Sequence, residues 1–131
     1  MARNRQPVVF LDTHIAVWLY AGLSEKISDK AKQAIDSCEI LISPLVRLEL
    51  QYLYEIGRVT AKPDTIIQAL FKAIGLKISE TPLLQIIDEA LKIRWTRDVF
   101  DRLLSAEARL LGKGFITADE TIRSNLNLAV W

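Results

Sequence analysis

The feature that most constrains the fold is a short apolar run, Pro7 to Leu11, which ends abruptly at Asp12. A continuous apolar run of this kind is typical of a strand buried on both faces, as in a parallel sheet covered by helices. In such sheets, ligands bind just beyond the carboxyl ends of the strands, which is where Asp12 stands. Asp is also a favoured N-cap residue, so capping the next helix is the simpler explanation for Asp12 alone.

Strands and helices are expected to alternate along the rest of the chain. Apolar runs predict further strands at 39–43, 76–78, 115–117 and 128–131. Helical spacing, capping residues and N-terminal prolines predict helices at 13–20, 28–37, 44–56, 63–73, 82–93 and 98–111, with a short helical turn after Asp119. This alternation predicts an α/β fold with a parallel sheet and right-handed crossovers.

Composition limits the class of protein. With 131 residues, half of them hydrophobic and a quarter charged, residues 1–131 are expected to form a single soluble domain. One cysteine, Cys38, and one histidine, His14, exclude disulfide frameworks and Cys/His zinc sites, and they fit a reducing cytoplasm. The basic Met1–Arg5 start precedes an apolar run too short for a signal peptide, and no stretch is long enough for a membrane span. The net charge of +1 neither requires nor excludes a nucleic-acid partner.

Glu49 is an unusual residue for its position. In the predicted helix it lies on or beside an apolar stripe formed by Leu45, Leu48, Leu53 and Ile56. A carboxylate buried without a partner is costly, so a metal ion or another cation is expected nearby. The alternative is that Glu49 lies at the border of the stripe and its carboxylate reaches water.

Three more acids stand where strands end or helices begin. Asp98 and Asp101 fit an acidic variant of the capping box, although Asp101 also shares a helix face with Leu104 and Ala108 and is expected to point inward. Asp119 follows the strand at 115–117, and either Thr117 or Asp119 can cap the turn after it.

Taken together, these acids predict a cation site. A parallel sheet brings Asp12, Glu49, Asp101 and Asp119 to one rim, where each close pair of carboxylates repels by about 4 kcal/mol at an effective dielectric constant near 20. Mg²⁺ or Mn²⁺ suits ligands that are all oxygen atoms. Such an ion activates water for displacement at phosphorus without a histidine or cysteine, and His14 is therefore expected to be structural.

The motifs resemble those of a PIN domain and, more narrowly, of the VapC-type toxins of bacterial toxin–antitoxin pairs. The resemblance lies in the segments around Leu11–His14, Ser43–Leu50, Arg97–Ala108 and Phe115–Asp119, in that order. It implies a three-layer α/β/α sandwich around a parallel sheet of four to five strands. It also implies a cytoplasmic Mg²⁺- or Mn²⁺-dependent endoribonuclease that forms a homodimer and is inhibited by an antitoxin.

By this resemblance, the catalytic and metal-binding quartet is Asp12, Glu49, Asp101 and Asp119, and Thr117, Asp98 and Thr13 support it. Two positions depart from the family pattern. Val99 replaces a proline common before the Phe-Asp pair, and Val46 replaces a small hydroxyl residue that often precedes the glutamate by three.

The sequence also offers candidate RNA contacts. Arg47, Arg97 and Arg102 are candidate RNA contacts, together with Arg94 and Arg123, and Trp95 could stack on a base. The simpler interpretation is that these arginines are solvated surface charges and that the tryptophan is partly buried.

Two other functions remain open. The runner-up is a catalytically inactive PIN-like module that binds RNA or protein, although such a module has no need for mutually repelling acids. A phosphoacceptor receiver domain also carries acids at strand ends, but it needs a lysine late in the sheet, and Phe115–Asp119 has none.

Overall fold

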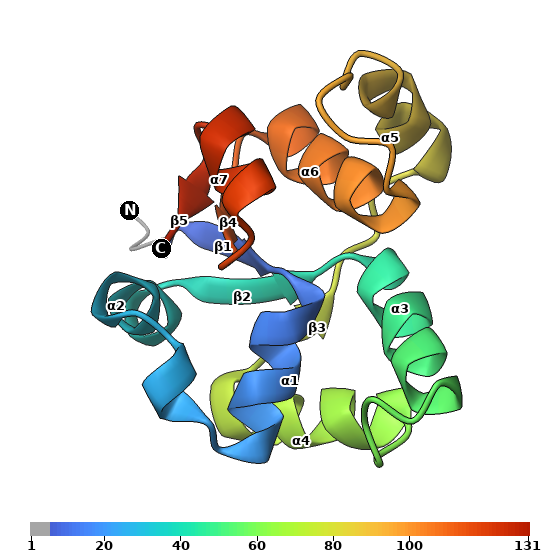
Figure 1. Cartoon of the computed structure of the whole chain (residues 1–131). Coiled ribbons are helices and arrows are strands. Elements are labelled where there is room, and N and C mark those ends of the chain that lie inside the picture. Colours follow the sequence, from blue (N-terminus) through green and yellow to red (C-terminus); the bar gives the residue numbers. More distant parts are fainter. Residues whose placement is uncertain (1–5) are drawn as a thin grey trace.

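The computed structural model describes residues 6–131, so the basic Met1–Arg5 segment lies outside the described residues. The strands are β1 (Val8–Leu11), β2 (Glu39–Ile42), β3 (Lys77–Ile78), β4 (Gly114–Ile116) and β5 (Ala129–Val130). They form one sheet in the order β3-β2-β1-β4-β5, and every neighbouring pair is parallel (Figure 1). The predicted α/β fold with a parallel sheet is confirmed.

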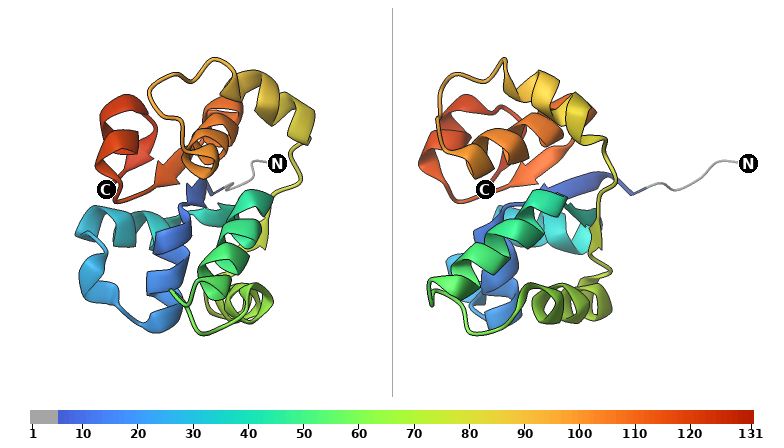
Figure 2. Two further views of the ribbon diagram at one scale, coloured as in Figure 1. Left: turned by 45° about the vertical axis from the view of Figure 1, so that its right-hand side comes forward. Right: turned by 90° about the vertical axis from the view of Figure 1, so that its right-hand side faces the viewer.

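Helices cover both faces of this sheet. They are α1 (Thr13–Ala21), α2 (Asp29–Ser37), α3 (Pro44–Glu55), α4 (Pro63–Ile74), α5 (Leu83–Ala90), α6 (Val99–Leu111) and α7 (Glu120–Asn125), with a short 3₁₀ helix, η1 (Ser24–Lys26), after α1. Figures 1 and 2 show α1 to α4 on one side of the sheet and α5 to α7 on the other, so the predicted three-layer sandwich is confirmed. In the part of the chain described, no helix is both long and apolar enough to cross a bilayer.

Strand β1 lies at the centre of the sheet and of the main core. Val9, Phe10 and Leu11 are all buried, as expected for a strand covered by helices on both faces. The side chains of Phe115 and Ile116 on the adjacent strand β4 belong to the same core. The apolar run that opens the sequence therefore forms the strand on which the others assemble.

The strand order creates a crevice at one end of the sheet. From β1 the chain builds outward through β2 and β3 on one side, and then returns to add β4 and β5 on the other. At such a switch point the connections leave in opposite directions and open a crevice beyond the strands' carboxyl ends. Asp12 follows β1 at this point, and its backbone N–H donates to the carbonyl of Ile116 at 2.9 Å.

The orientation of α3 differs from the predicted one. Its buried residues are Val46, Leu50 and Leu53, whereas Leu48 and Ile56 are 57% and 48% exposed. The predicted stripe was wrong because several apolar residues on α3 face outward and obscure the periodicity. Glu49 therefore lies beside Leu53 at the border of the buried face and is half-buried.

Helix α5 is shorter than the helix predicted at 82–93. It begins after Pro82, which is the N-cap residue, and no side chain caps it. The hydroxyl of Thr81, the residue before Pro82, does not cap the helix and donates instead to Glu107 Oε2 at 2.8 Å. A tertiary contact has replaced the local one.

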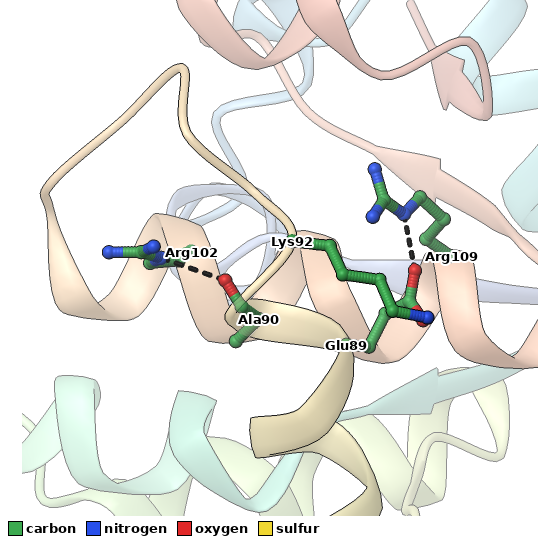
Figure 3. Close-up of polar contacts among 5 residues, drawn as sticks. All are labelled: Glu89, Ala90, Lys92, Arg102 and Arg109. Carbon is green, nitrogen blue, oxygen red and sulfur yellow. Dashed lines mark hydrogen bonds and ion pairs between the residues drawn. The ribbon is translucent and has the colours of Figure 1, made fainter.

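Helices α5 and α6 pack together around a small second core, which contains Ile86, Ala90, Ile93 and Ala106. Polar contacts reinforce the pair (Figure 3). Arg102 Nε donates to the carbonyl of Ala90 at 2.9 Å, and Arg109 Nε pairs with Glu89 at 2.5 Å. This pairing fixes α6, and with it the first-turn residue Asp101.

Candidate functional site

One hollow of about 370 Å³ lies beyond the carboxyl ends of the central strands and collects the acids that the sequence singled out. All four acids of the predicted quartet line it, and so does Asp98. Its lining residues are Asp12, His14, Trp18, Glu49, Asp98, Asp101, Ala118 and Asp119. We call it the acidic pocket. Residues that are more than a hundred positions apart in the chain meet here because β1 and β4 are neighbours.

Asp12 is the most buried of these acids, with 7% of its surface exposed. Its Oδ1 accepts a hydrogen bond from the Thr13 backbone N–H at 2.8 Å, and its Oδ2 accepts one from the Thr117 hydroxyl at 2.7 Å. Burial raises the pKa of the Asp12 carboxyl, and these two hydrogen bonds oppose the rise. Asp12 thus caps α1 and also presents a carboxylate to the pocket, so the two interpretations hold together.

Glu49 reaches the pocket from α3. The Thr13 hydroxyl donates to Glu49 Oε1 at 2.5 Å, and burial raises the pKa of the Glu49 carboxyl. Thr13 is itself fully buried. Its backbone binds Asp12 and its side chain binds Glu49, so Thr13 fixes the positions of both acids.

Thr117 links the ends of β1 and β4 in a similar way. Fully buried, it donates to Asp12 and accepts a hydrogen bond from the Asp119 backbone N–H at 3.1 Å. Asp119 Oδ1 then caps α7 through the Ile122 backbone N–H at 2.9 Å. The sequence left Thr117 and Asp119 as alternative N-caps of this helix, and in the structure the N-cap is Asp119.

Asp98 and Asp101 enter from the start of α6. Asp98 Oδ1 caps the helix by accepting from the Asp101 backbone N–H at 2.9 Å, as the capping-box pattern predicts. Burial, and then repulsion from Asp98, Asp12, Asp119 and Glu49, raise the pKa of the Asp101 carboxyl to about 7. Within residues 6–131, no group donates a hydrogen bond to this carboxylate.

The donor set of the pocket fits a hard divalent cation, because its acids offer only oxygen ligands and repel one another without one. Among residues 6–131, however, no three His, Cys, Asp or Glu side chains are already close enough to share one ion. A cation here would therefore bind one or two carboxylates directly and reach the others through water, the usual mode for Mg²⁺.

The structure adds two residues to the site that the sequence did not suggest. Exposed His14, expected to be structural, lines the pocket, and its ring centroid lies 6.3 Å from that of Trp18. Trp18 packs on the main core and lines the pocket as well. The sequence signal that could have placed His14 at the pocket is its position directly after Asp12 and Thr13.

None of the arginines predicted to contact RNA lines the acidic pocket. Arg47 forms a two-pronged ion pair with Asp64, at 2.8 and 3.0 Å, in a different hollow between α3 and α4. Arg102 is bound to the end of α5 (Figure 3), and Arg97 is exposed. Trp95 is half-buried, packs against both cores and does not line the acidic pocket.

Comparison with known proteins identifies the family. The PIN domain family model matches residues 9–125, so the chain belongs to the PIN domain family. The predicted PIN domain is confirmed. A comparison with curated proteins gave no significant match.

Solved structures share the fold. A chain of the VapBC2 structure from Rickettsia felis, bound to a DNA fragment from the promoter, aligns with a TM-score of 0.66 and 16% identity, over 93% of this chain and 95% of that one. A chain of a toxin–antitoxin complex from Klebsiella pneumoniae aligns with a TM-score of 0.65 and 19% identity, over 94% and 96% of the two chains. The fold is therefore one that occurs in toxin–antitoxin complexes.

Proposed function

We propose that this single-domain protein is a cytoplasmic Mg²⁺- or Mn²⁺-dependent endoribonuclease that acts as the toxin of a toxin–antitoxin pair. One observation carries the proposal: five acids line the acidic pocket, where burial and then their mutual repulsion raise the pKa of Asp101 to about 7. Carboxylates brought together at such a cost indicate a cation. The PIN family match and the toxin–antitoxin neighbours support the choice of nuclease.

In this proposal Asp12, Glu49, Asp101 and Asp119 hold the cation directly or through water, and Asp98 adds negative charge beside it. When bound, the ion supplies an activated water and stabilises charge on the phosphate in the transition state. The hydroxyls of Thr13 and Thr117 fix Glu49 and Asp12 in place. Asp101 and Asp119 project from the first turn of α6 and the cap of α7, so both helices orient a carboxylate toward the pocket.

Partners follow from the same reasoning. We propose a homodimer that an antitoxin inhibits, in line with the complexes that share the fold. Exposed apolar residues run along α5 (Leu83, Leu84, Ile87 and Leu91) and along α3 (Leu48, Tyr52 and Ile56). Contiguous apolar residues on a surface are typical of protein interfaces. Light scattering on the purified protein measures the oligomeric state, and a monomer at micromolar concentration contradicts the homodimer.

The alternative is a catalytically inactive PIN-like module that binds RNA or protein. The observation that favours it is the absence, among residues 6–131, of three ligands already arranged around one ion. The alternative predicts that RNA stays intact when Mn²⁺ is added.

The test is cleavage of a labelled single-stranded RNA with Mn²⁺ or with a chelator. Asp12→Asn is expected to slow Mn²⁺-dependent cleavage by about 10³-fold, which corresponds to about 4 kcal/mol of lost stabilisation of the transition state. Asn keeps one oxygen that can accept from the Thr13 backbone N–H, and its side-chain NH₂ can donate to the Thr117 hydroxyl oxygen, so the variant should fold. Asp88→Asn, at an exposed position on α5, is the control. Cleavage that survives Asp12→Asn, or that needs no metal, contradicts the proposal.

A further inference from the structure

A second hollow of about 540 Å³ lies beside the acidic pocket and has the opposite charge character. Its lining residues are Lys30, Glu120, Arg123, Ser124, Ala129 and Trp131. We call it the basic hollow. The lining residues come from α2, from α7 and from β5 with Trp131 directly after it. Both helices contact that strand. Figure 1 shows α2 and α7 at the same edge of the sheet, on either side of β5.

The two hollows adjoin one another. Asp119 lines the acidic pocket, and the next residue, Glu120, lines the basic hollow. Trp18 lines the first and Trp131 the second, and the centroids of their rings are 6.4 Å apart. The ammonium of Lys26 lies 5.6 Å from the centroid of the Trp18 ring. A ligand that extends from the acidic pocket along this aromatic pair therefore meets positive charge.

The cations of the basic hollow are available to a ligand. Among residues 6–131, Lys30 and Arg123 form no ion pair, unlike Arg47, Lys92 and Arg109. Glu120 is the one carboxylate side chain that lines the hollow. Two unpaired cations and the hydroxyl of Ser124 together suit a phosphate group, which accepts hydrogen bonds from all three.

We propose that the basic hollow binds the backbone phosphate of an RNA nucleotide that neighbours the phosphodiester to be cut. Lys30 and Arg123 hold that phosphate, and the Trp18–Trp131 pair forms the wall along which the intervening nucleotide lies. This inference rests on the proposed nuclease function. Aromatic side chains beside basic ones are a usual arrangement for single-stranded RNA, because bases stack on rings while phosphates meet cations.

Binding is measured first, separately from cleavage. The probe is a fluorescein-labelled single-stranded RNA of about 12 nucleotides, within the range of single-strand site sizes. Fluorescence anisotropy in the Asp12→Asn protein, without divalent metal, gives the Kd. Lys30→Gln and Arg123→Gln are each expected to raise Kd about 3- to 10-fold. Each should also reduce the slope of log K against log salt by about 0.7.

Lys72→Gln is the matched control, because it removes the same charge from an exposed position on α4, away from the basic hollow. It should change neither Kd nor the salt slope. A loss of affinity equal to that of Lys30→Gln and Arg123→Gln means that the effect is net charge alone, and overturns the subsite. Absence of RNA binding by the Asp12→Asn protein also overturns it.

Cleavage then separates this inference from the function on which it rests. In the otherwise native protein, Lys30→Gln and Arg123→Gln should raise KM by the factor measured for Kd. If the protein cuts RNA and neither substitution changes Kd, the subsite is wrong and the nuclease stands. If RNA binding depends on Lys30 and Arg123 but no RNA is cut with Mn²⁺, the nuclease is wrong and the subsite stands as part of a binding module.

Discussion

Helix α6 carries two carboxylates, six residues apart, in very different surroundings. Glu107 is fully buried between α6 and the β3–α5 connection, where Ser79 and Thr81 both donate hydrogen bonds to its Oε2. Asp101 lies in the first turn and is only partly buried, and its carboxylate receives no hydrogen bond from residues 6–131. Burial, and then repulsion from four other carboxylates, raise its pKa to about 7.

The difference shows how a structural acid is told from a functional one. A single buried carboxylate is tolerated when hydroxyl groups donate to it, and Glu107 joins α6 to the loop before α5 in this way. A group of carboxylates with too few donors is unfavourable unless a cation arrives. Burial alone would have selected Glu107, whose Oε1 also has no hydrogen-bond partner among residues 6–131. Crowding by four other carboxylates is what selects Asp101.

The largest effect is expected at Glu107. Ser79→Ala combined with Thr81→Val removes both donors and leaves a buried carboxylate unpartnered, so the free energy of unfolding should fall by about 2–4 kcal/mol. Urea denaturation measures this change. Adding Mn²⁺ should not restore the loss relative to the native protein, because this site is structural. Selective rescue by Mn²⁺ would break the comparison, since Glu107 would then also be a cation site.

A smaller effect is expected at Thr117. Thr117→Val removes the hydrogen bond to Asp12 Oδ2 and lets that carboxylate turn, so affinity for Mn²⁺ should fall by about 10- to 100-fold. Isothermal titration calorimetry measures the affinity. Thr121→Val, at an exposed position on α7, is the control and should leave it unchanged. Equal affinities in native protein and Thr117→Val would mean that Asp12 needs no hydroxyl to be positioned.

The smallest effect is a pH dependence. Because the folded-state pKa of Asp101 lies at about 7, above the unfolded value of about 3.9, the folded state binds more protons between these pH values. The stability of the metal-free protein should therefore fall as pH rises from about 4 to about 7, by a modest amount because water reaches this residue. Urea midpoints measured in chelator across this range give the slope, and Asp101→Asn should flatten it. A slope that Asp101→Asn leaves unaltered would assign the effect to other groups.

The positions of the acids were predictable because the periodicity of the sequence already encodes them. Asp12 and Asp119 each follow a buried strand, and two parallel neighbours necessarily end at the same rim. Asp98 and Asp101 stand at a helix start whose capping pattern is local. Strand ends and caps depend on few residues, so the sequence determines them well.

Other features depend on contacts between distant segments, which the sequence pattern does not contain. The inward face of α3 was mispredicted because Leu48 and Ile56 are apolar yet exposed. Arg47 has its partner, Asp64, on another helix, and Thr81 serves Glu107 rather than its own helix. The basic hollow also forms only when β5 brings α2 and α7 to one edge.

The most direct test of the central claim is the stability of the purified protein with and without Mn²⁺, compared with that of Asp101→Asn and Asp12→Asn. If the acids of the pocket share a cation, Mn²⁺ at about 100 times its Kd should stabilise the native protein by about 2.7 kcal/mol and both variants much less. Stabilisation that is equal in all three proteins, or absent from the native one, would contradict the claim.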